Sequence, residues 1–289
     1  MFAMLAVSCA NKTKQVECVA ADTLSIDDID EVEALVEDEA ESVPFIYEKC
    51  SVSEKFGVCN YATEVDYPTG GSPELLETIR GWITAVLVPQ SLNSTYKRFV
   101  PSRDGSWDDG NAVLNFYAKD YERIENEMAG EDDLAEGVET EFTTKITVEH
   151  ESNNLITYNF NRYEYAGGAH GGTYAMGATF FKDSGKKVSW DILSSKNAIR
   201  PEIIAGLKKY FEVRTNAELE ESLMLPENAT LANIPLPDTE PWLTSDGLCL
   251  VYQQYEIASY AAGMPCVVIP FSQLEKYLKP EYRQLICGE

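Results

Sequence analysis

The sequence predicts an α+β fold, with antiparallel sheets and packed helices arranged as two consecutive subdomains. Two observations carry this prediction. Apolar residues recur at helical spacing in two early segments, whereas alternating apolar and polar segments later follow one another with short turns between them. Strands joined by short turns pair antiparallel, and a parallel sheet would need a long crossover between successive strands. The order of the segments therefore favours α+β over a parallel α/β sheet.

The first nine residues are apolar, and small residues directly precede Cys9. This pattern is typical of the end of a bacterial lipoprotein signal, after which the cysteine becomes the acylated N-terminus. A basic segment and the full apolar length of such a signal are missing, so an ordinary thiol on an apolar terminus is the alternative. We expect residues 1–9 to be the remnant of a lipoprotein signal, with Cys9 lipidated.

Residues 10–42 form a predicted acidic tether. From position 21 to position 42 the chain is dense in Asp and Glu and contains no Lys or Arg. Like charges at this density repel one another and extend a chain. We expect a solvated spacer that holds the folded part away from the membrane. Lys12 and Lys14, close after Cys9, favour the periplasmic face over the cell surface.

The N-terminal α+β subdomain is predicted to span residues 43–165. Ser72 is a suitable N-cap for its first helix, Pro73 suits the first helical position, and Pro89 ends the apolar stripe. A second stripe predicts another helix at 111–128. Alternation and turn residues predict the strands, which cover 45–52, 58–67, 141–151 and 155–165.

The C-terminal α+β subdomain is predicted to span residues 166–289. It is expected to open with a hairpin of strands 173–182 and 187–192 around an Asp-Ser-Gly-Lys turn. The later pattern predicts, in order, a helix at 199–213, a long surface loop at 226–241, strands at 248–255 and 266–270, and a short helix at 272–278.

The formal net charge of −25 limits the partners of the chain. Such a charge repels the phosphates of nucleic acids and anionic bilayers. We therefore expect no nucleic acid partner, and membrane association only through the lipid anchor. A cationic partner, such as a basic protein, agrees with the charge.

The chain has seven cysteines, six of them besides Cys9. In an exported chain these can form disulfides, with about 15 complete pairings. Two pairs lie on neighbouring strand-like segments, Cys50 with Cys59 and Cys249 with Cys266, and we expect these to bond. Free buried thiols are the alternative. No Cys-x-x-Cys pair occurs, so no metal site is expected.

His170 lies within the sequence Gly-Gly-Ala-His-Gly-Gly. Imidazole titrates near neutral pH and glycines expose backbone amides, which are features of catalytic sites. No nucleophile motif accompanies this histidine, and His150 is the only other one, which is too few for a conventional histidine-rich zinc site. We expect no enzyme activity and no cofactor. A tight turn stabilised by His170 is the simplest interpretation.

Six residues are the candidate ligand contacts. They flank glycine or alanine turns and combine aromatic surface with hydrogen-bond acceptors, as many binding sites do. The alternative is ordinary strand packing with tyrosine hydroxyls at the surface. The six are Glu164, Tyr165, His170, Tyr255, Glu256 and Tyr260.

Three segments occur in this order: residues 163–171, residues 188–193, and residues 255–265 followed by 268–270. Together they resemble one family. It is the extracytoplasmic domain family found in the anti-sigma factor RsiV and in the N-terminal half of the peptidoglycan deacetylase PdaC, and also in stand-alone lipoproteins. The resemblance covers about residues 43–278 and implies an α+β fold of two subdomains. RsiV senses lysozyme by binding it, and the catalytic chemistry of PdaC belongs to a separate domain. The resemblance therefore implies binding rather than catalysis.

These observations predict a non-catalytic envelope lipoprotein whose ectodomain binds a protein or a peptidoglycan-type glycan. A peptidoglycan-directed hydrolase that uses His170 and a purely structural lipoprotein are the alternatives. The loop that carries His170 is expected at one end of a sheet, with the ring directed toward residues 163–165. At least one of its glycines is expected to have a positive φ.

Overall fold

The computed structural model describes residues 43–88, 105–128 and 138–288. All of them belong to one unit, Ser42–Glu289. The predicted signal remnant with Cys9, and the predicted acidic tether, lie outside the described residues. Within the described part of the chain, no helix has both the length and the apolar character needed to cross a membrane.

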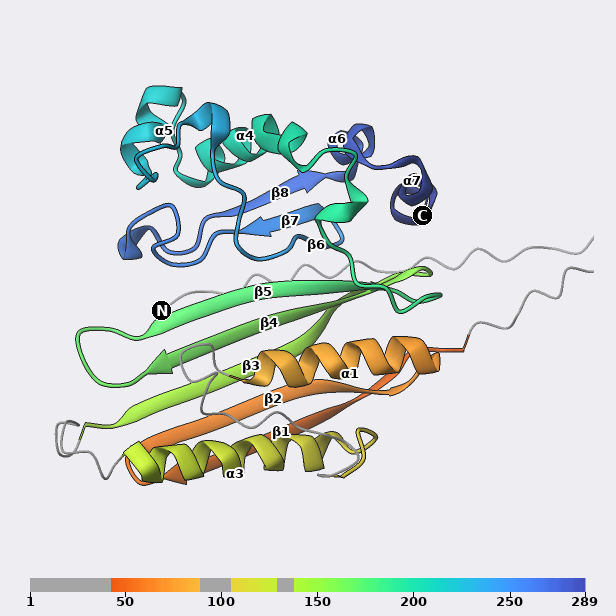
Figure 1. Ribbon diagram of the computed structural model, residues 1–289, viewed down its shortest axis with the longest axis vertical. Helices are drawn as coiled ribbons and strands as arrows, with labels where there is room; N and C mark the ends of the chain where they lie inside the picture. Colours follow the sequence, from red (N-terminus) through yellow and green to blue (C-terminus); the bar gives the residue numbers. More distant parts are fainter. Residues whose placement is uncertain (1–42, 89–104, 129–137, 289) are drawn as a thin grey trace, which may run out of the picture. The chain divides into compact units, whose positions relative to one another are not determined.

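A five-stranded sheet forms the first layer, in the order β1-β2-β3-β4-β5 (Figure 1). Its neighbours pair antiparallel except for β2 and β3, which run parallel. Parallel neighbours need a long connection, and the described part of the segment between β2 and β3 contains the helices α1 (Pro73–Leu87) and α3 (Gly110–Met128). The strands are β1 (Ile46–Phe56), β2 (Cys59–Gly70), β3 (Thr140–Glu151), β4 (Leu155–Tyr165) and β5 (Gly172–Phe181).

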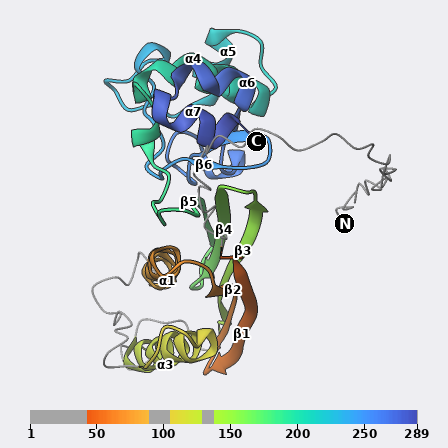
Figure 2. The same ribbon diagram turned by 90° about the vertical axis from the view of Figure 1, so that its right-hand side faces the viewer.

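Helices α1 and α3 cover the same face of the sheet (Figure 2). The predicted cap of α1 is confirmed, because Ser72 Oγ accepts a hydrogen bond from the Leu75 amide at 3.3 Å. Apolar side chains from alternate strand positions and from the helix stripes fill the space between the layers. They include Tyr61, Val65, Tyr67, Ile79, Ile83, Val113, Tyr117, Phe142, Ile146 and Phe160.

A smaller three-stranded sheet, in the order β6-β7-β8, forms a second core with the C-terminal helices. All its neighbours pair antiparallel. The strands are β6 (Trp242–Leu243), β7 (Gly247–Val251) and β8 (Cys266–Pro270). The helices are α4 (Arg200–Tyr210), α5 (Asn216–Ser222), α6 (Phe271–Leu274) and α7 (Pro280–Cys287).

Buried hydrogen bonds join the two sheets at β6. The Thr157 hydroxyl on β4 donates to the Leu243 carbonyl at 2.8 Å, and the Leu243 amide donates to the Thr179 hydroxyl on β5 at 2.8 Å. All three residues are fully buried. Because buried polar groups need partners, this reciprocal arrangement fixes β6 against the larger sheet.

The predicted fold class is confirmed: the described residues form an α+β structure with mostly antiparallel sheets. The predicted strand at 187–192 is wrong. Lys187 makes one isolated bridge to Phe180, and a 3-10 helix, Trp190–Ile192, follows. The cause of this helical turn is local: Ser189 Oγ accepts a hydrogen bond from the Asp191 amide, which turns the chain into a helical conformation.

The subdomain boundary predicted between residues 165 and 166 also needs correction. It divides the larger sheet, since β5 pairs with β4 along its whole length. Phe180 belongs to the core beneath α1 and α3, whereas Phe181 belongs to the second core. The change from one core to the other therefore occurs at the end of β5.

The predicted disulfide between Cys50 and Cys59 is wrong. Both residues lie on the paired strands β1 and β2, but Cys50 is opposite Val65 and Cys59 is opposite Phe56. From position 50 to position 56, an extended strand rises about 20 Å, whereas bonded cysteines have Cα atoms only about 4.4–6.8 Å apart. Both thiols are free and buried.

Candidate functional site

The loop that carries His170 connects β4 and β5 at one end of the larger sheet. Gly167 and Gly168 have φ values of +86° and +117°, so the predicted positive φ is confirmed. The Tyr165 hydroxyl donates to the Gly168 carbonyl at 3.1 Å and so spans the turn.

A second loop, residues 252–265 between β7 and β8, lies against the same end of β5; we call it the tyrosine loop. Its Gln253 side chain accepts from the Ala175 amide at 3.1 Å and donates to the Ala175 carbonyl at 2.7 Å. Gln254 accepts from the Thr173 amide at 2.9 Å. The two glutamines thus satisfy backbone groups at the free edge of β5, as a further strand would.

Three rings from these two loops form one group, the aromatic cluster of His170, Tyr255 and Tyr260. The His170 ring stacks on Tyr260 with centroids 3.8 Å apart and planes inclined by 23°. The Tyr255 ring lies 5.8 Å from that of Tyr260. The sequence predicted that the His170 ring is directed toward residues 163–165; this is wrong, because the ring faces the tyrosine loop.

Two hydrogen bonds orient the His170 ring. Its Nδ1 lies 3.0 Å from the Gly171 carbonyl oxygen, and its Nε2 lies 3.4 Å from the Tyr255 hydroxyl. A carbonyl oxygen can only accept, so Nδ1 donates to Gly171, and Nε2 lies within hydrogen-bond distance of the Tyr255 hydroxyl. The Tyr260 hydroxyl donates to the same Gly171 carbonyl at 3.0 Å. One carbonyl thus aligns two of the rings.

Tyr255 combines exposure with backbone strain. Its φ is +66°, in the left-handed region that costs a residue with a Cβ about 1–2 kcal/mol. Its side chain is nevertheless 57% exposed, so little burial compensates for this cost. Strained residues of this kind gather at functional sites.

The other three candidate residues lie outside the aromatic cluster. Both oxygens of Glu256 accept backbone amides, those of Gln253 at 2.7 Å and Asp238 at 2.8 Å, and burial raises the pKa of this carboxyl. Glu164 lies 3.8 Å from the guanidinium of Arg162. Glu256 and Tyr165 thus hold the two loops in shape, and a direct ligand contact by these residues stays a prediction.

Two family models match consecutive parts of the chain. Residues 88–173 match the family described as deacetylase PdaC, and residues 189–272 match the family described as a protein of unknown function, DUF3298. The chain joins a PdaC-type region to a DUF3298 region. His170 belongs to the PdaC-type region, whereas Tyr255 and Tyr260 belong to the DUF3298 region. The aromatic cluster is therefore built where the two regions meet.

Solved structures of DUF3298 proteins share the fold. A family member from Bacteroides fragilis is 18% identical, with a TM-score of 0.64, over 86% of this chain and 99% of that one. A family protein from Pseudomonas aeruginosa PAO1 is 17% identical, with a TM-score of 0.55, over 82% and 95% of the two chains. No curated protein matches the sequence. The resemblance predicted from the sequence is confirmed by the two matching family models, and the predicted fold by the solved structures.

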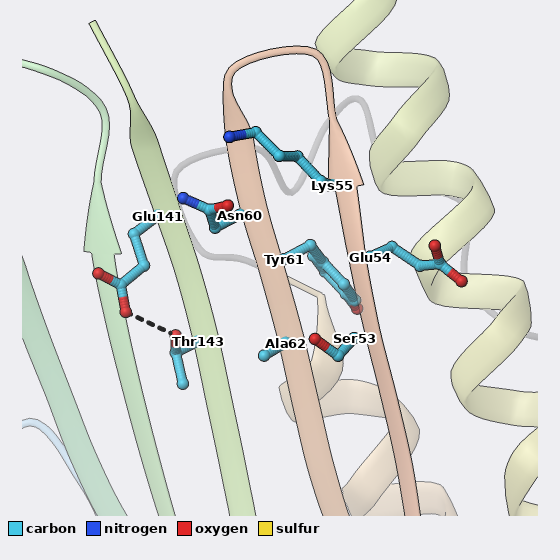
Figure 3. A pocket seen from close by; sticks show the side chains of 8 residues that line it. All are labelled: Ser53, Glu54, Lys55, Asn60, Tyr61, Ala62, Glu141 and Thr143. Carbon is cyan, nitrogen blue, oxygen red and sulfur yellow. Dashed lines mark hydrogen bonds between the residues drawn. The ribbon is translucent and has the colours of Figure 1, made fainter.

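A hollow of about 400 Å³ lies away from the aromatic cluster, on the sheet face opposite α1 and α3 (Figure 3). Ser53, Ala62 and Thr143 occupy one cross-strand row, which the paired register of β1, β2 and β3 aligns. Longer side chains, Lys55 and Glu141 among them, flank this row. The sequence reasoning missed it, although small residues at outward strand positions are its signal. Its lining is that of an ordinary solvated sheet face.

The predicted pair Cys249 and Cys266 lies in the DUF3298 region, beneath the tyrosine loop. The two sulfur atoms are 3.5 Å apart and both thiols are free. The structure therefore brings the two residues together without a bond, and the disulfide itself stays a prediction.

The surroundings of His170 bear on the catalytic alternative. Its ring nitrogens face a backbone carbonyl and a tyrosine hydroxyl, and its ring face covers Tyr260. Among the described residues, no group of three or more His, Cys, Asp or Glu side chains is arranged to hold a metal ion.

Proposed function

We propose that this protein is a non-catalytic envelope lipoprotein whose ectodomain binds a peptidoglycan-type glycan at the aromatic cluster. The observation that carries the proposal is Tyr255, an exposed ring held in a strained backbone conformation beside the stacked pair of His170 and Tyr260. Exposed aromatic faces are electron-rich and stack against the C–H groups of sugar rings.

Polar groups beside the rings support a neutral, hydroxyl-rich ligand. The Tyr255 hydroxyl and the exposed loop backbone around His170 offer donors and acceptors at the edge of the cluster. Specific sites combine apolar surface with a few fixed polar groups in this way. The net charge of −25 does not oppose an uncharged N-acetylated sugar.

Lipidation at Cys9 and attachment to the envelope, with the periplasmic face favoured, complete the proposal. The small residues before Cys9 and the acidic segment after it support the anchor, and Lys12 and Lys14 support the periplasmic face. Mass spectrometry of the protein from its native host tests it, since an unmodified Cys9 or a mature N-terminus elsewhere would contradict the anchor.

A cationic protein is the second candidate ligand, because the chain has 48 acidic against 23 basic residues. Electrostatic attraction of this kind is screened by salt, whereas sugar stacking is not. Binding of lysozyme that disappears at high salt and is unchanged in Tyr255→Gly would favour the protein ligand over the glycan.

Retention on insoluble peptidoglycan tests the leading proposal. The chain is expected to be retained and to be released by soluble oligomers of N-acetylglucosamine. Tyr255→Gly is expected to lose retention, and Glu212→Gly, which changes another positive-φ residue outside the cluster, is the matched control. Equal retention of the two variants, or none by the native chain, would overturn it.

The hydrolase alternative has its own test. Release of soluble muropeptides by the native chain, lost in His170→Ala, would establish catalysis and contradict a purely binding role. A folded chain that neither binds nor cleaves peptidoglycan or lysozyme would favour the structural alternative.

A further inference from the structure

Cys249 and Cys266 form a close pair at the base of the tyrosine loop. In the register of β7 and β8, Cys249 is opposite Val268 and Cys266 is opposite Val251. The two cysteines therefore project from the same face of the sheet as diagonal neighbours, which fits their sulfur separation of 3.5 Å.

The two thiols have different surroundings. Cys249 is buried and packs with Trp242, Val251 and Met264, whereas Cys266 is exposed. The two sulfur atoms lie within hydrogen-bond distance, and either thiol can be the donor; this interaction lowers the pKa of Cys266 and raises that of Cys249. The Glu149 carboxylate opposes a thiolate at both sites. Cys266 is thus the accessible nucleophile, and Cys249 lies behind it as the resolving thiol.

The pair encloses the loop that carries two members of the aromatic cluster. Two residues of β7, Leu250 and Val251, separate Cys249 from the start of the tyrosine loop. Cys266 directly follows the last residue of the loop, Pro265. Next to the paired strands β7 and β8, a backbone hydrogen bond from the Tyr252 amide to the Pro265 carbonyl, at 2.9 Å, joins the two ends of the loop. A covalent bond at this point would join the two ends of the loop.

We propose that Cys249 and Cys266 are a redox-active pair whose oxidation to a disulfide closes the tyrosine loop and preorganises Tyr255 and Tyr260 for ligand. The regulatory part of this proposal rests on the proposed function, because it needs a ligand at the aromatic cluster. The redox part concerns the two thiols alone.

The oxidant is a disulfide compound. The Cys266 thiolate attacks one of its sulfur atoms, which forms a mixed disulfide and releases the first thiol. The Cys249 thiol then gives its proton to solvent and attacks Cys266 Sγ, which releases the second thiol. Two protein thiols thus lose two electrons, and one external disulfide becomes two thiols.

Oxidised glutathione tests the redox part on the full chain, with peptide mapping to locate the products. The native chain is expected to form the Cys249–Cys266 disulfide. Cys249→Ser is expected to accumulate a mixed disulfide on Cys266, and Cys266→Ser to leave Cys249 unmodified. A native chain that keeps a mixed disulfide on Cys266, or in which Cys266 does not react, would overturn the pair.

Hydrogen exchange and binding, each compared between oxidised and reduced protein, test the regulatory part. Oxidation is expected to slow exchange of the amides of the tyrosine loop and to tighten binding to N-acetylglucosamine oligomers about threefold, as preorganisation of one or two side chains would. Cys287→Ser, which removes a free thiol outside the pair, is expected to behave as the native chain does.

The two proposals fail in different ways. Unchanged loop exchange with a disulfide in place would overturn the closure of the loop, whatever binds there. Slower exchange of the loop amides after oxidation, with no binding of N-acetylglucosamine oligomers in either state, would support the redox pair. It would overturn the glycan proposal together with its regulation.

Discussion

The indole ring of Trp242 packs directly against the backbone of Gly177. Trp242 lies on β6 and Gly177 on β5, so this contact joins the two sheets. A Cβ at position 177 would overlap the ring. Only a glycine allows β6 to approach closely enough for Leu243 to reach the hydroxyls of Thr157 and Thr179.

Gly177→Ala is expected to destabilise the protein by about 1–3 kcal/mol, the usual cost of overpacking a filled core. Chemical denaturation measures the change. Gly172→Ala on the same strand is the control, because nothing lies within 4 Å of a Cβ at that position. Equal stability of the two variants would show that the sheets separate without cost.

Arg162 closes the C-terminal end of α1. Its buried guanidinium donates to the carbonyls of Val86 at 2.6 Å and Leu87 at 3.1 Å, and it lies over the rings of Phe142 and Phe160. Carbonyls at a helix C-terminus carry partial negative charge and need donors. Helix, sheet and core thus meet at one side chain.

Arg162→Met is expected to cost about 3 kcal/mol or more, because it leaves these buried carbonyls without a charged donor. Lys145→Met, which removes an exposed ion pair with Glu64 on the same sheet, should change stability by less than about 1 kcal/mol. A loss at Arg162 no larger than the loss at Lys145 would contradict the capping role.

Local patterns predicted the elements whose ends carry strong signals. The Ser72 cap and the Ser-Asn-Asn turn placed α1, β3 and β4 almost to the residue. The parallel pairing of β2 with β3 was missed, because it joins segments about 80 residues apart and depends on how the crossover packs. The short strand β6 was missed for a similar reason: it pairs with β7 over only two residues, and the bonds that hold it against the larger sheet are to Thr157 and Thr179, far away in sequence.

The candidate site was predicted in composition but not in arrangement. The glycines indicated the turn at His170, and aromatic content indicated Tyr255 and Tyr260. Their stacking depends on the meeting of two regions, which no local pattern encodes. Glu256 was chosen as a ligand contact for its acceptors, but those acceptors are used by backbone amides of its own loop.

The titration of Glu256 predicts how the stability of the protein depends on pH. Burial raises the pKa of its carboxyl above the ordinary value of 4.5, so the folded protein holds this proton more tightly than the unfolded chain does. The contribution of Glu256 to stability is therefore greatest below about pH 4.5 and falls as the pH rises through the folded pKa.

Glu256→Gln removes this titration. The stability of the native chain relative to the Gln variant is expected to fall between pH 4 and pH 7, as measured by denaturation at each pH. A relative stability that rises over this interval would mean that the two amide hydrogen bonds outweigh burial and that the pKa is lowered instead.

Tyr255→Gly separates the backbone from the ring. Glycine adopts the φ of +66° without strain, which offsets the entropy that glycine loses on folding, and the lost ring is largely exposed. Stability is therefore expected to stay within about 1 kcal/mol of the native value. Glu212→Gly, at a φ of 56° after the end of α4, relieves the same kind of strain and should behave alike in denaturation. The two variants should then differ in ligand binding alone, because only Tyr255 contributes to the aromatic cluster. If Tyr255→Gly instead unfolds the protein while Glu212→Gly does not, the ring of Tyr255 holds the tyrosine loop together, and its strained backbone has a structural cause.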